Sequence, residues 1–382
     1  MIKQTQKTFM NRKYPGSETN LPCKGNSSVC FYSMSMSSAD RPILNNLSDD
    51  DYRENHSLSK KAAAKDAPLV SVIIPTYNRK KMLIESVHSV LLQSHPHIEV
   101  IIVDDGSTDG TEDLIQEEFP DEKRIKFHRN EKNLGAGQSR KRGYQLSQGE
   151  FMVFLDDDDL YVDIDFFSKA IEKHQEYEDL TFVCAHAYLE DIRTGKRKVH
   201  RLNFKDGLHS RKYLQGFQTI YQKPYFFAAV FRRSYLDQAG LIDMEMVNDG
   251  PVFLRSLLFG RVWALSDKVG VYRFHGENIS FGLTPTFITD NLEEKIKVGE
   301  KAKERSLLDD PEQWLIEQIV LTLRYFIYDS KPKEEAVKKV LDWNRKRNTG
   351  KVQKSVEKAI RRLWLRRRIS KRLQFLKTWS KR

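Results

Sequence analysis

Four consecutive aspartates, Asp156 to Asp159, directly follow the apolar run from Phe151 to Leu155. Four like charges at the end of a buried strand repel one another, and a divalent cation neutralises such a cluster. A polar loop or a helix N-cap also favours aspartate, but a cap needs one acid and not four. We therefore predict a metal site at these residues.

A second pair of acids, Asp104 and Asp105, ends another apolar run, Ile98 to Val103, and a third run from Leu69 to Ile74 closes at Pro75. Helical patterns lie between these runs, which predicts an α/β fold with a doubly wound, mostly parallel sheet. Ligands bind at the C-terminal edge of the strands in such sheets. Both groups of acids are therefore expected to share one crevice.

The remaining elements follow from the same patterns of apolar residues. Helices are expected over about 109–118, 135–147, 164–177, 234–239, 252–259 and 314–328, and strands over about 125–128, 181–189, 262–265 and 268–274. The chain divides into a disordered or poorly packed extension (1–67), an α/β domain (68–283), a helical extension packed on it (284–332) and a basic amphipathic tail (333–382).

Composition narrows the class of protein. In these 382 residues there is no apolar run long enough to span a membrane and no secretory signal, which predicts a cytoplasmic protein. Cys23, Cys30 and Cys184 do not have the spacing of metal ligands. The net charge of +11 arises in the tail, where residues 331–382 hold 20 lysines and arginines against 4 acids. The main body is slightly acidic, which argues against nucleic acid as a partner.

Four segments taken together resemble the family 2 glycosyltransferases of the GT-A fold, in order and in spacing. They are VSVIIPTYN (70–78), VDDGSTDGT (103–111), NLG (133–135) with SRKRG (139–143), and LDDDD (155–159). The resemblance runs from about residue 69 to residue 282. It implies an enzyme that binds a nucleotide sugar.

The resemblance assigns roles to the aspartate cluster. Asp156 and Asp158 match the acids of the family's D-x-D motif, and Asp158 is expected to be the principal ligand of Mn²⁺ or Mg²⁺, with Asp156 assisting. A metal held by carboxylates neutralises the charge that grows on the diphosphate as the glycosidic bond breaks. Asp156 or Asp157 is expected to meet the ribose. Asp159 either shares the direct role or caps the following helix.

Other matched positions are expected around the nucleotide. The turn after the first strand, at Pro75, Thr76 and Tyr77, wraps the nucleotide in the family. Asp105 matches the acid that reads the base, commonly uracil, because a carboxylate accepts from its N3–H. Asp104 could equally bond backbone amides of the Gly-Ser-Thr turn.

Three further residues are carried over from the family. Arg140 matches an arginine that approaches the diphosphate, and its alternative is a solvated helix position. Asp249 matches the second acid of a Glu-Asp pair and is the expected general base, although Asn248 replaces the glutamate. The alternative for Asp249 is a helix N-cap. His275 lies in a segment like Y-R-x-H and could reach the diphosphate or the metal, or be structural.

These assignments lead to a functional hypothesis. The expected activity is inverting transfer of a hexosyl or N-acetylhexosaminyl group from a UDP-sugar to a glycan or lipid-linked acceptor in cell-surface polysaccharide synthesis. Transfer to a protein or a teichoic-type polymer, or a non-catalytic module that binds nucleotide sugar or membrane, are the alternatives.

The basic tail suggests a site of action. Residues 351–382 alternate basic and apolar side chains, and the apolar face changes near Arg366 to Arg368, which predicts two short helices or one broken helix. Such a segment suits the anionic inner face of a cell membrane, and its alternative is a solvated run of charge.

Overall fold

The computed structural model describes residues 67–276, 283–328, 330 and 332–379, with side chains described as far as residue 369. Apart from its last residue, the expected N-terminal extension (1–67) lies outside the described part, as do Cys23 and Cys30.

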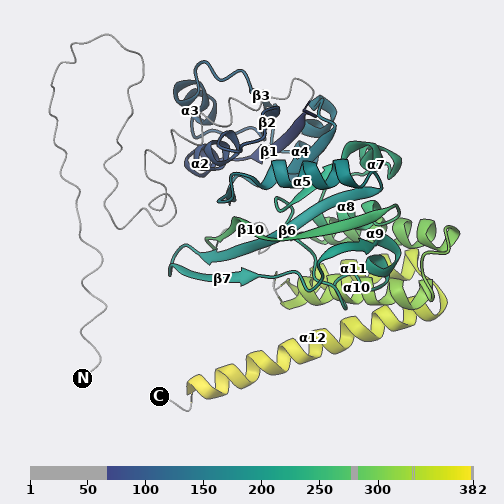
Figure 1. Ribbon diagram of the computed structural model, residues 1–382. Coiled ribbons are helices and arrows are strands. Elements are labelled where there is room, and N and C mark those ends of the chain that lie inside the picture. The colour runs from purple at the N-terminus through teal and green to yellow at the C-terminus, as the bar shows by residue number, and fades with distance from the viewer. Residues whose placement is uncertain (1–66, 277–282, 329, 331, 380–382) are drawn as a thin grey trace, which may run out of the picture. The chain divides into compact units, whose positions relative to one another are not determined.

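The first half of the domain alternates strand and helix (Figure 1). Strands β1 (Val70–Thr76), β2 (Ile98–Asp104), β3 (Ile125–Arg129) and β4 (Phe151–Phe154) pair in parallel in the order β3-β2-β1-β4. Helices α2 (Lys80–Leu91), α3 (Thr111–Glu118) and α4 (Ala136–Leu146) connect them. The predicted α/β class is confirmed, and the strand ends that carry the acids lie along one edge.

The second half continues the same sheet with mixed pairing. Strand β9 (Ala229–Arg232) runs antiparallel to both β4 and β6 (Leu180–Asp191). Strands β6 and β10 (Arg261–Phe274) are parallel to each other. The two strands predicted at 262–265 and 268–274 are one strand, because register shifts between Ala264 and Lys268 carry the pairing across the polar residues. The other elements are β5 (Leu160–Tyr161), α5 (Phe166–Glu176), β6 (Leu180–Asp191), β7 (Lys196–His200), β8 (Asp206–His209), α6 (Ser210–Gln215), α7 (Arg233–Gln238), α8 (Asp249–Ser256) and β10 (Arg261–Phe274).

Successive side chains of each central strand point alternately into two separate hydrophobic cores, as expected of a sheet buried on both faces. Ile73 and Phe154 face α4 and α8, whereas Val72 and Val153 face α2 and α5. All four side chains are fully buried. This double burial holds the strand ends, and hence the acids, at fixed positions.

The C-terminal part is a helical bundle with its own core. It comprises α9 (Pro285–Glu304), α10 (Pro311–Tyr328), α11 (Glu334–Arg347) and α12 (Gly350–Trp379). Helix α12 is continuous, so the predicted break near Arg366 is wrong (Figure 1). Val356 and Ile360 are buried in the bundle, whereas Leu365 and Ile369 are exposed. Packing thus covers the first apolar face of α12 and leaves Leu365 and Ile369 of the second one open.

Helix α9 joins the bundle to the α/β domain through buried charges. Arg255 of α8 pairs with Glu294 of α9 at 2.6 Å, and both side chains are 6% exposed. Lys295 is buried beside them, and its ammonium donates to the backbone oxygen of Gln318 at 3.1 Å. Burial lowers the pKa of Lys295 to about 7, because the charged form is poorly solvated there. Within the described ranges, no helix has the length and apolarity needed to cross a bilayer.

Replacement of this lysine by methionine is expected to stabilise the protein. The unfolded chain binds a proton on Lys295 up to about pH 10.5, but the folded chain binds it only below about pH 7. The lysine therefore destabilises the fold most below about pH 7, and the effect falls as the pH rises toward the unfolded pKa. We expect Lys295→Met to raise the free energy of unfolding by roughly 2–4 kcal/mol at pH 7, and less at pH 10.

Urea unfolding at both pH values measures this effect. The exposed Lys301→Met on the same helix is the matched control and should change little at either pH. A gain that does not shrink at pH 10 would contradict the assigned cause.

Candidate active site

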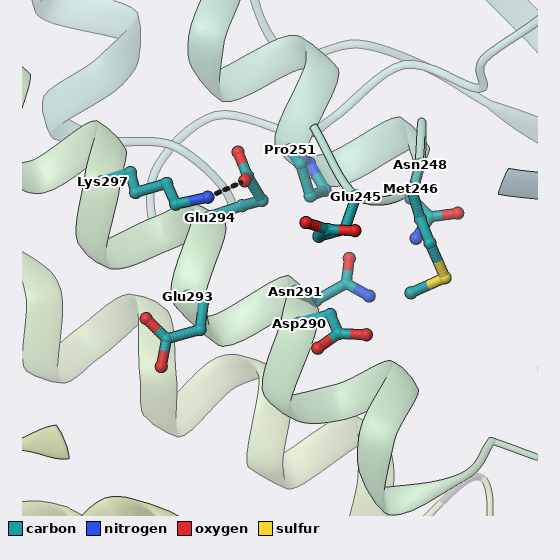
Figure 2. Close-up of a pocket in the computed structure, with 9 residues that line it drawn as sticks. All are labelled: Glu245, Met246, Asn248, Pro251, Asp290, Asn291, Glu293, Glu294 and Lys297. Atoms are coloured by element: carbon teal, nitrogen blue, oxygen red, sulfur yellow. Dashed lines mark hydrogen bonds and ion pairs between the residues drawn. The ribbon is translucent and has the colours of Figure 1, made fainter. Parts of the chain in front are cut away.

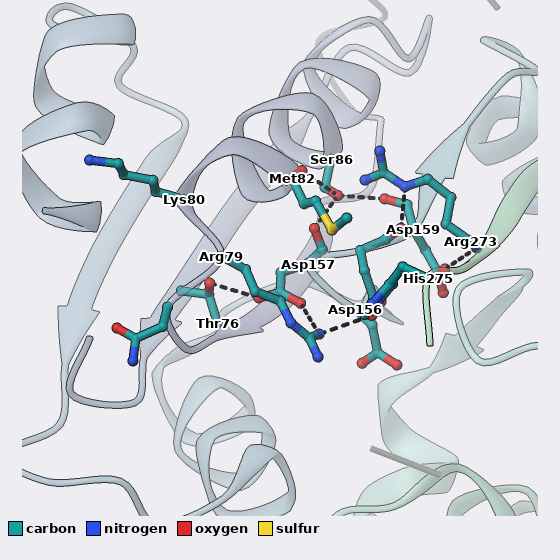
Figure 3. Close-up of polar contacts among 12 residues, drawn as sticks. Thr76, Arg79, Lys80, Met82, Ser86, Asp156, Asp157, Asp159, Arg273 and His275 are labelled. Carbon is teal, nitrogen blue, oxygen red and sulfur yellow. Dashed lines mark hydrogen bonds and ion pairs between the residues drawn. The ribbon is translucent and has the colours of Figure 1, made fainter. Parts of the chain in front are cut away.

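The aspartate cluster lies at the end of β4, between the turn after β1 and the end of β10 (Figure 3). Asp157 accepts from the hydroxyl of Thr76 at 2.8 Å with Oδ2 and from Arg79 at 3.0 Å with Oδ1. Burial raises the pKa of Asp157 to about 7, because it outweighs the effect of Arg79. Thr76 and Asp157, both predicted site residues, are therefore in direct contact.

Asp156 points toward the second half of the domain. Its Oδ1 pairs with Arg140 of α4, whose side chain is 8% exposed. The other terminal nitrogen of Arg140 donates to the backbone oxygen of Val247 at 3.3 Å. The alternative of a solvated helix arginine is thus wrong. Arg140 bridges the acid cluster to the segment that leads into Asp249.

The last two acids meet strand β10. Oδ2 of Asp158 is 2.9 Å from Nε2 of His275, and Oδ1 of Asp159 accepts from the backbone N–H of Arg273 at 3.1 Å. Burial, together with the charges of Asp158 and Asp156, raises the pKa of Asp159 well above its usual range. The alternative that Asp159 caps the next helix is wrong, because α5 begins only at Phe166.

The donor atoms present suit a hard divalent cation. Asp156, Asp158 and Asp159 each offer a carboxylate oxygen, and these oxygens lie within 4.8 Å of one another. Carboxylate oxygens are the ligands preferred by Mg²⁺ and Mn²⁺. The raised pKa of Asp159 fits the same conclusion, since neighbouring carboxylates without a cation disfavour each other's charge.

The acid pair at the end of β2 lies beside this cluster but faces other partners. The backbone N–H of Asp105 donates to the Thr76 oxygen at 2.8 Å. The Asp105 side chain, 2% exposed, accepts from Asn130 at 2.8 Å and from the N–H groups of Leu134 at 2.9 Å and Gly135 at 2.7 Å. Its carboxylate therefore holds the loop before α4 in place.

Asp104 and Tyr77 complete this side of the site. Asp104 accepts a hydrogen bond from the N–H of Ser107 at 3.0 Å. This is a bond to the Gly-Ser-Thr turn, which the sequence predicted as the alternative role of Asp104. Pro75 lies within β1 opposite Val103. The Tyr77 side chain is 43% exposed, so its ring is accessible from solvent beside the acids.

Asp249 is the first residue of α8 rather than its N-cap, so the capping alternative is wrong. Its Oδ2 pairs with Lys223, and its side chain is 48% exposed. Partial burial disfavours the charged form of Asp249, but the ammonium of Lys223 and, to a smaller extent, the N–H of Gly250 lower its pKa below the usual value. Arg140 also lowers it. The carboxylate is therefore ionised near neutral pH and open to solvent, as a general base must be.

A pocket of about 120 Å³ lies near Asp249 but apart from the aspartate cluster (Figure 2). It separates the segment before α8 from α9, and Asn248 and Glu294 line it. Glu294 is neutralised by Arg255 at 2.6 Å and by Lys297 at 2.9 Å. The pocket is thus a gap at the junction of the domain and the bundle.

Sequence reasoning missed the basic residues that surround the acids. Arg79, Lys223 and Arg273 come from three separate regions of the chain, and none of them stands in the acidic motifs. A possible signal for Arg79 was its position in the turn directly after Asn78. Arg273 is the arginine of the Y-R-x-H segment, in which only His275 was given a role, whereas Lys223 meets Asp249 only through tertiary contact.

Comparison with known sequences decides the family. Residues 71–239 match the family model described as glycosyl transferase family 2. This part of the chain is a domain of that family. Relatives include a putative teichuronic acid biosynthesis glycosyltransferase of Bacillus subtilis, 50% identical over 92 residues, which are 24% of this chain and 36% of the relative. An uncharacterized glycosyltransferase of Nostoc is 31% identical over 219 residues, 55% of this chain and 66% of the relative. The matches thus span only part of each relative.

Solved structures agree on the fold. A crystal structure of S. aureus TarS 1-349 in complex with UDP-GlcNAc matches with a TM-score of 0.58 and 19% identity, over 79% of this chain and 92% of that one. The likeness extends beyond the residues matched by the family model. At this identity the likeness shows the GT-A fold.

The contacts of Asp105 generate a test of its role. Asp105→Asn replaces an acceptor of three hydrogen bonds by an amide, and we expect a loss of about 1–3 kcal/mol of stability without any ligand. Thermal unfolding of the ligand-free protein measures it, with exposed Asp113→Asn of α3 as control. Unchanged stability would favour a role for Asp105 in recognising the nucleotide base alone.

Proposed function

We propose that this protein transfers a hexosyl or N-acetylhexosaminyl group from a UDP-sugar to a glycan or lipid-linked acceptor in cell-surface polysaccharide synthesis. The observation that carries the proposal is the bridge made by Arg140, which bonds both Asp156 and the backbone before Asp249. A donor site and a candidate base are thereby held next to each other. The Bacillus relative named for teichuronic acid and the UDP-GlcNAc complex of TarS support the substrate class.

Each group has a part in the proposed reaction. Asp156, Asp158 and Asp159 would hold Mn²⁺ or Mg²⁺, which when bound neutralises charge on the diphosphate. Pro75, Thr76 and Tyr77, with Asp104, Asp105 and Asp157, border the nucleotide, and Arg140 and His275 lie at its diphosphate end. Asp249 removes the proton from the acceptor hydroxyl, which attacks the anomeric carbon directly and inverts it.

Binding and chemistry can be separated by mutation. Asp249→Asn is expected to keep Mn²⁺-dependent binding of UDP but to lower UDP release from a donor by about 10²–10⁴-fold, because only the base is lost. Asp158→Asn should lose both. Calorimetry with UDP and Mn²⁺, and a UDP-release assay over a panel of UDP-sugars, give the two readouts.

The exposed Glu172→Gln of α5 is the control for this pair and should retain both properties. If the wild type binds UDP but releases none from any donor or acceptor tried, the non-catalytic alternative is favoured. Activity that survives in Asp249→Asn would refute its role as base.

We further propose that the distal part of α12 attaches the protein to the inner face of the cell membrane. Leu365 and Ile369 are 59% and 49% exposed, and Arg366 and Arg368 are exposed next to them. Arg367 is instead buried, and it donates to the backbone oxygen of Pro332 at 2.9 Å. The exposed side chains combine apolar and basic character, as in helices that lie on anionic membranes.

Charge removal on α12 tests this attachment. The double variant Arg366→Gln and Arg368→Gln is expected to weaken binding to anionic vesicles at least about tenfold, since each basic residue near such a surface contributes roughly 1 kcal/mol. Cosedimentation with vesicles measures it. Lys338→Gln with Lys339→Gln on α11 removes the same charge from exposed positions and should have less effect. Equal effects of the two pairs would reject attachment through α12.

A further inference from the structure

Arg79 occupies the centre of the aspartate cluster, although it lies outside the acidic motifs. It precedes α2, and a single terminal nitrogen of its guanidinium lies 3.0 Å from Oδ1 of Asp157 and 2.9 Å from Oδ2 of Asp158 (Figure 3). The same oxygen of Asp158 is 2.9 Å from His275. One carboxylate oxygen of Asp158, the residue expected to be the principal metal ligand, is therefore already engaged by a cationic side chain.

A metal ion bound to that oxygen would lie close to the guanidinium of Arg79 in the present arrangement. A divalent ion binds a carboxylate oxygen at about 2.0–2.6 Å, which would bring it close to the guanidinium nitrogen on the same atom. Two positive groups at that separation repel strongly where solvent is largely excluded. The Asp157 and Asp158 side chains are only 5% and 7% exposed. A metal ion on this oxygen would therefore compete with Arg79 for it.

The backbone that precedes Arg79 does not depend on the contacts of its side chain with the acids. The backbone before it is held in place, because Asn78, in a left-handed conformation, accepts from the N–H of Thr108 at 2.8 Å and donates its own N–H to Ser107 at 2.9 Å. The Arg79 side chain itself is 23% exposed. The long side chain can thus turn toward solvent without movement of the turn.

We propose that Arg79 is an internal counter-cation that closes the metal position until the donor arrives. It neutralises Asp157 and Asp158 in the donor-free protein and competes with a bare metal ion for Asp158. Metal that arrives with a nucleotide diphosphate brings negative charge, to which the displaced guanidinium can turn. The inference deepens the proposed function, since it rests on a metal-dependent donor site.

The test is Mn²⁺ binding without nucleotide, followed by electron paramagnetic resonance or calorimetry. Arg79→Gln should bind Mn²⁺ about tenfold or more tightly than the wild type, because a hydrogen-bonded charge that competes for the site has been removed. Arg79→Lys, which keeps the charge but not the fork of donors, should fall between the two.

Two control variants show whether a gain in Mn²⁺ affinity arises at this site. Lys80→Gln removes the same charge from the neighbouring residue, whose side chain points away from the acids, and should leave the affinity nearly unchanged (Figure 3). Asp158→Asn added to Arg79→Gln should abolish the gain. Thermal unfolding of each variant shows whether it is folded, and Arg79→Lys carries the test if Arg79→Gln is not.

Two results would overturn the inference. One is an affinity for Mn²⁺ that is equal or lower in the folded Arg79 variants, and the other is no Mn²⁺ binding in any variant. Failure of the proposed function is a separate result. In that case the gain in Mn²⁺ affinity would appear in Arg79→Gln while no UDP-sugar released UDP.

Discussion

Neutralisation of buried negative charge is the constraint on which the site depends. Asp157, Asp158 and Asp159 are each at most 5% exposed at the end of one strand. Buried carboxylates without partners are strongly unfavourable, so the fold must supply positive groups or bind a cation. Arg79, Arg140 and Arg273 approach the cluster from the turn after β1, from α4 and from β10. The site is thus assembled by charges drawn from distant parts of the chain.

The same constraint links the donor side to the candidate base. Arg140 can pair with Asp156 only because α4 packs on β1 and β2, where Tyr144 lies in the same core as Ile73 and Val103. Its second bond holds the backbone at Val247, two residues before Asp249. Any shift of α4 would therefore alter both halves of the site together. The α8–α9 pair of Arg255 and Glu294 extends this connection to the helical bundle.

Much of the fold followed from the sequence, because its signals are local. Apolar runs such as Ile98–Val103 and Phe151–Leu155 predicted buried parallel strands, and the structure has strands there. The break predicted in α12 failed, since a change of apolar face does not interrupt the hydrogen bonds of a helix. Packing covers one face with the bundle at Val356 and Ile360, and Leu365 stays exposed on the other. The pattern could not show which face would be covered.

For the site, the sequence by itself determined which acids are present and that they follow buried strands, because an apolar run and the acids after it are adjacent in the sequence. It also determined the family, through four spaced segments. Only the tertiary structure decided how those acids are neutralised. Arg79 meets Asp157 across 78 residues and Lys223 meets Asp249 across 26 residues. Contacts of that range arise when the sheet and helices pack, and no local pattern encodes them.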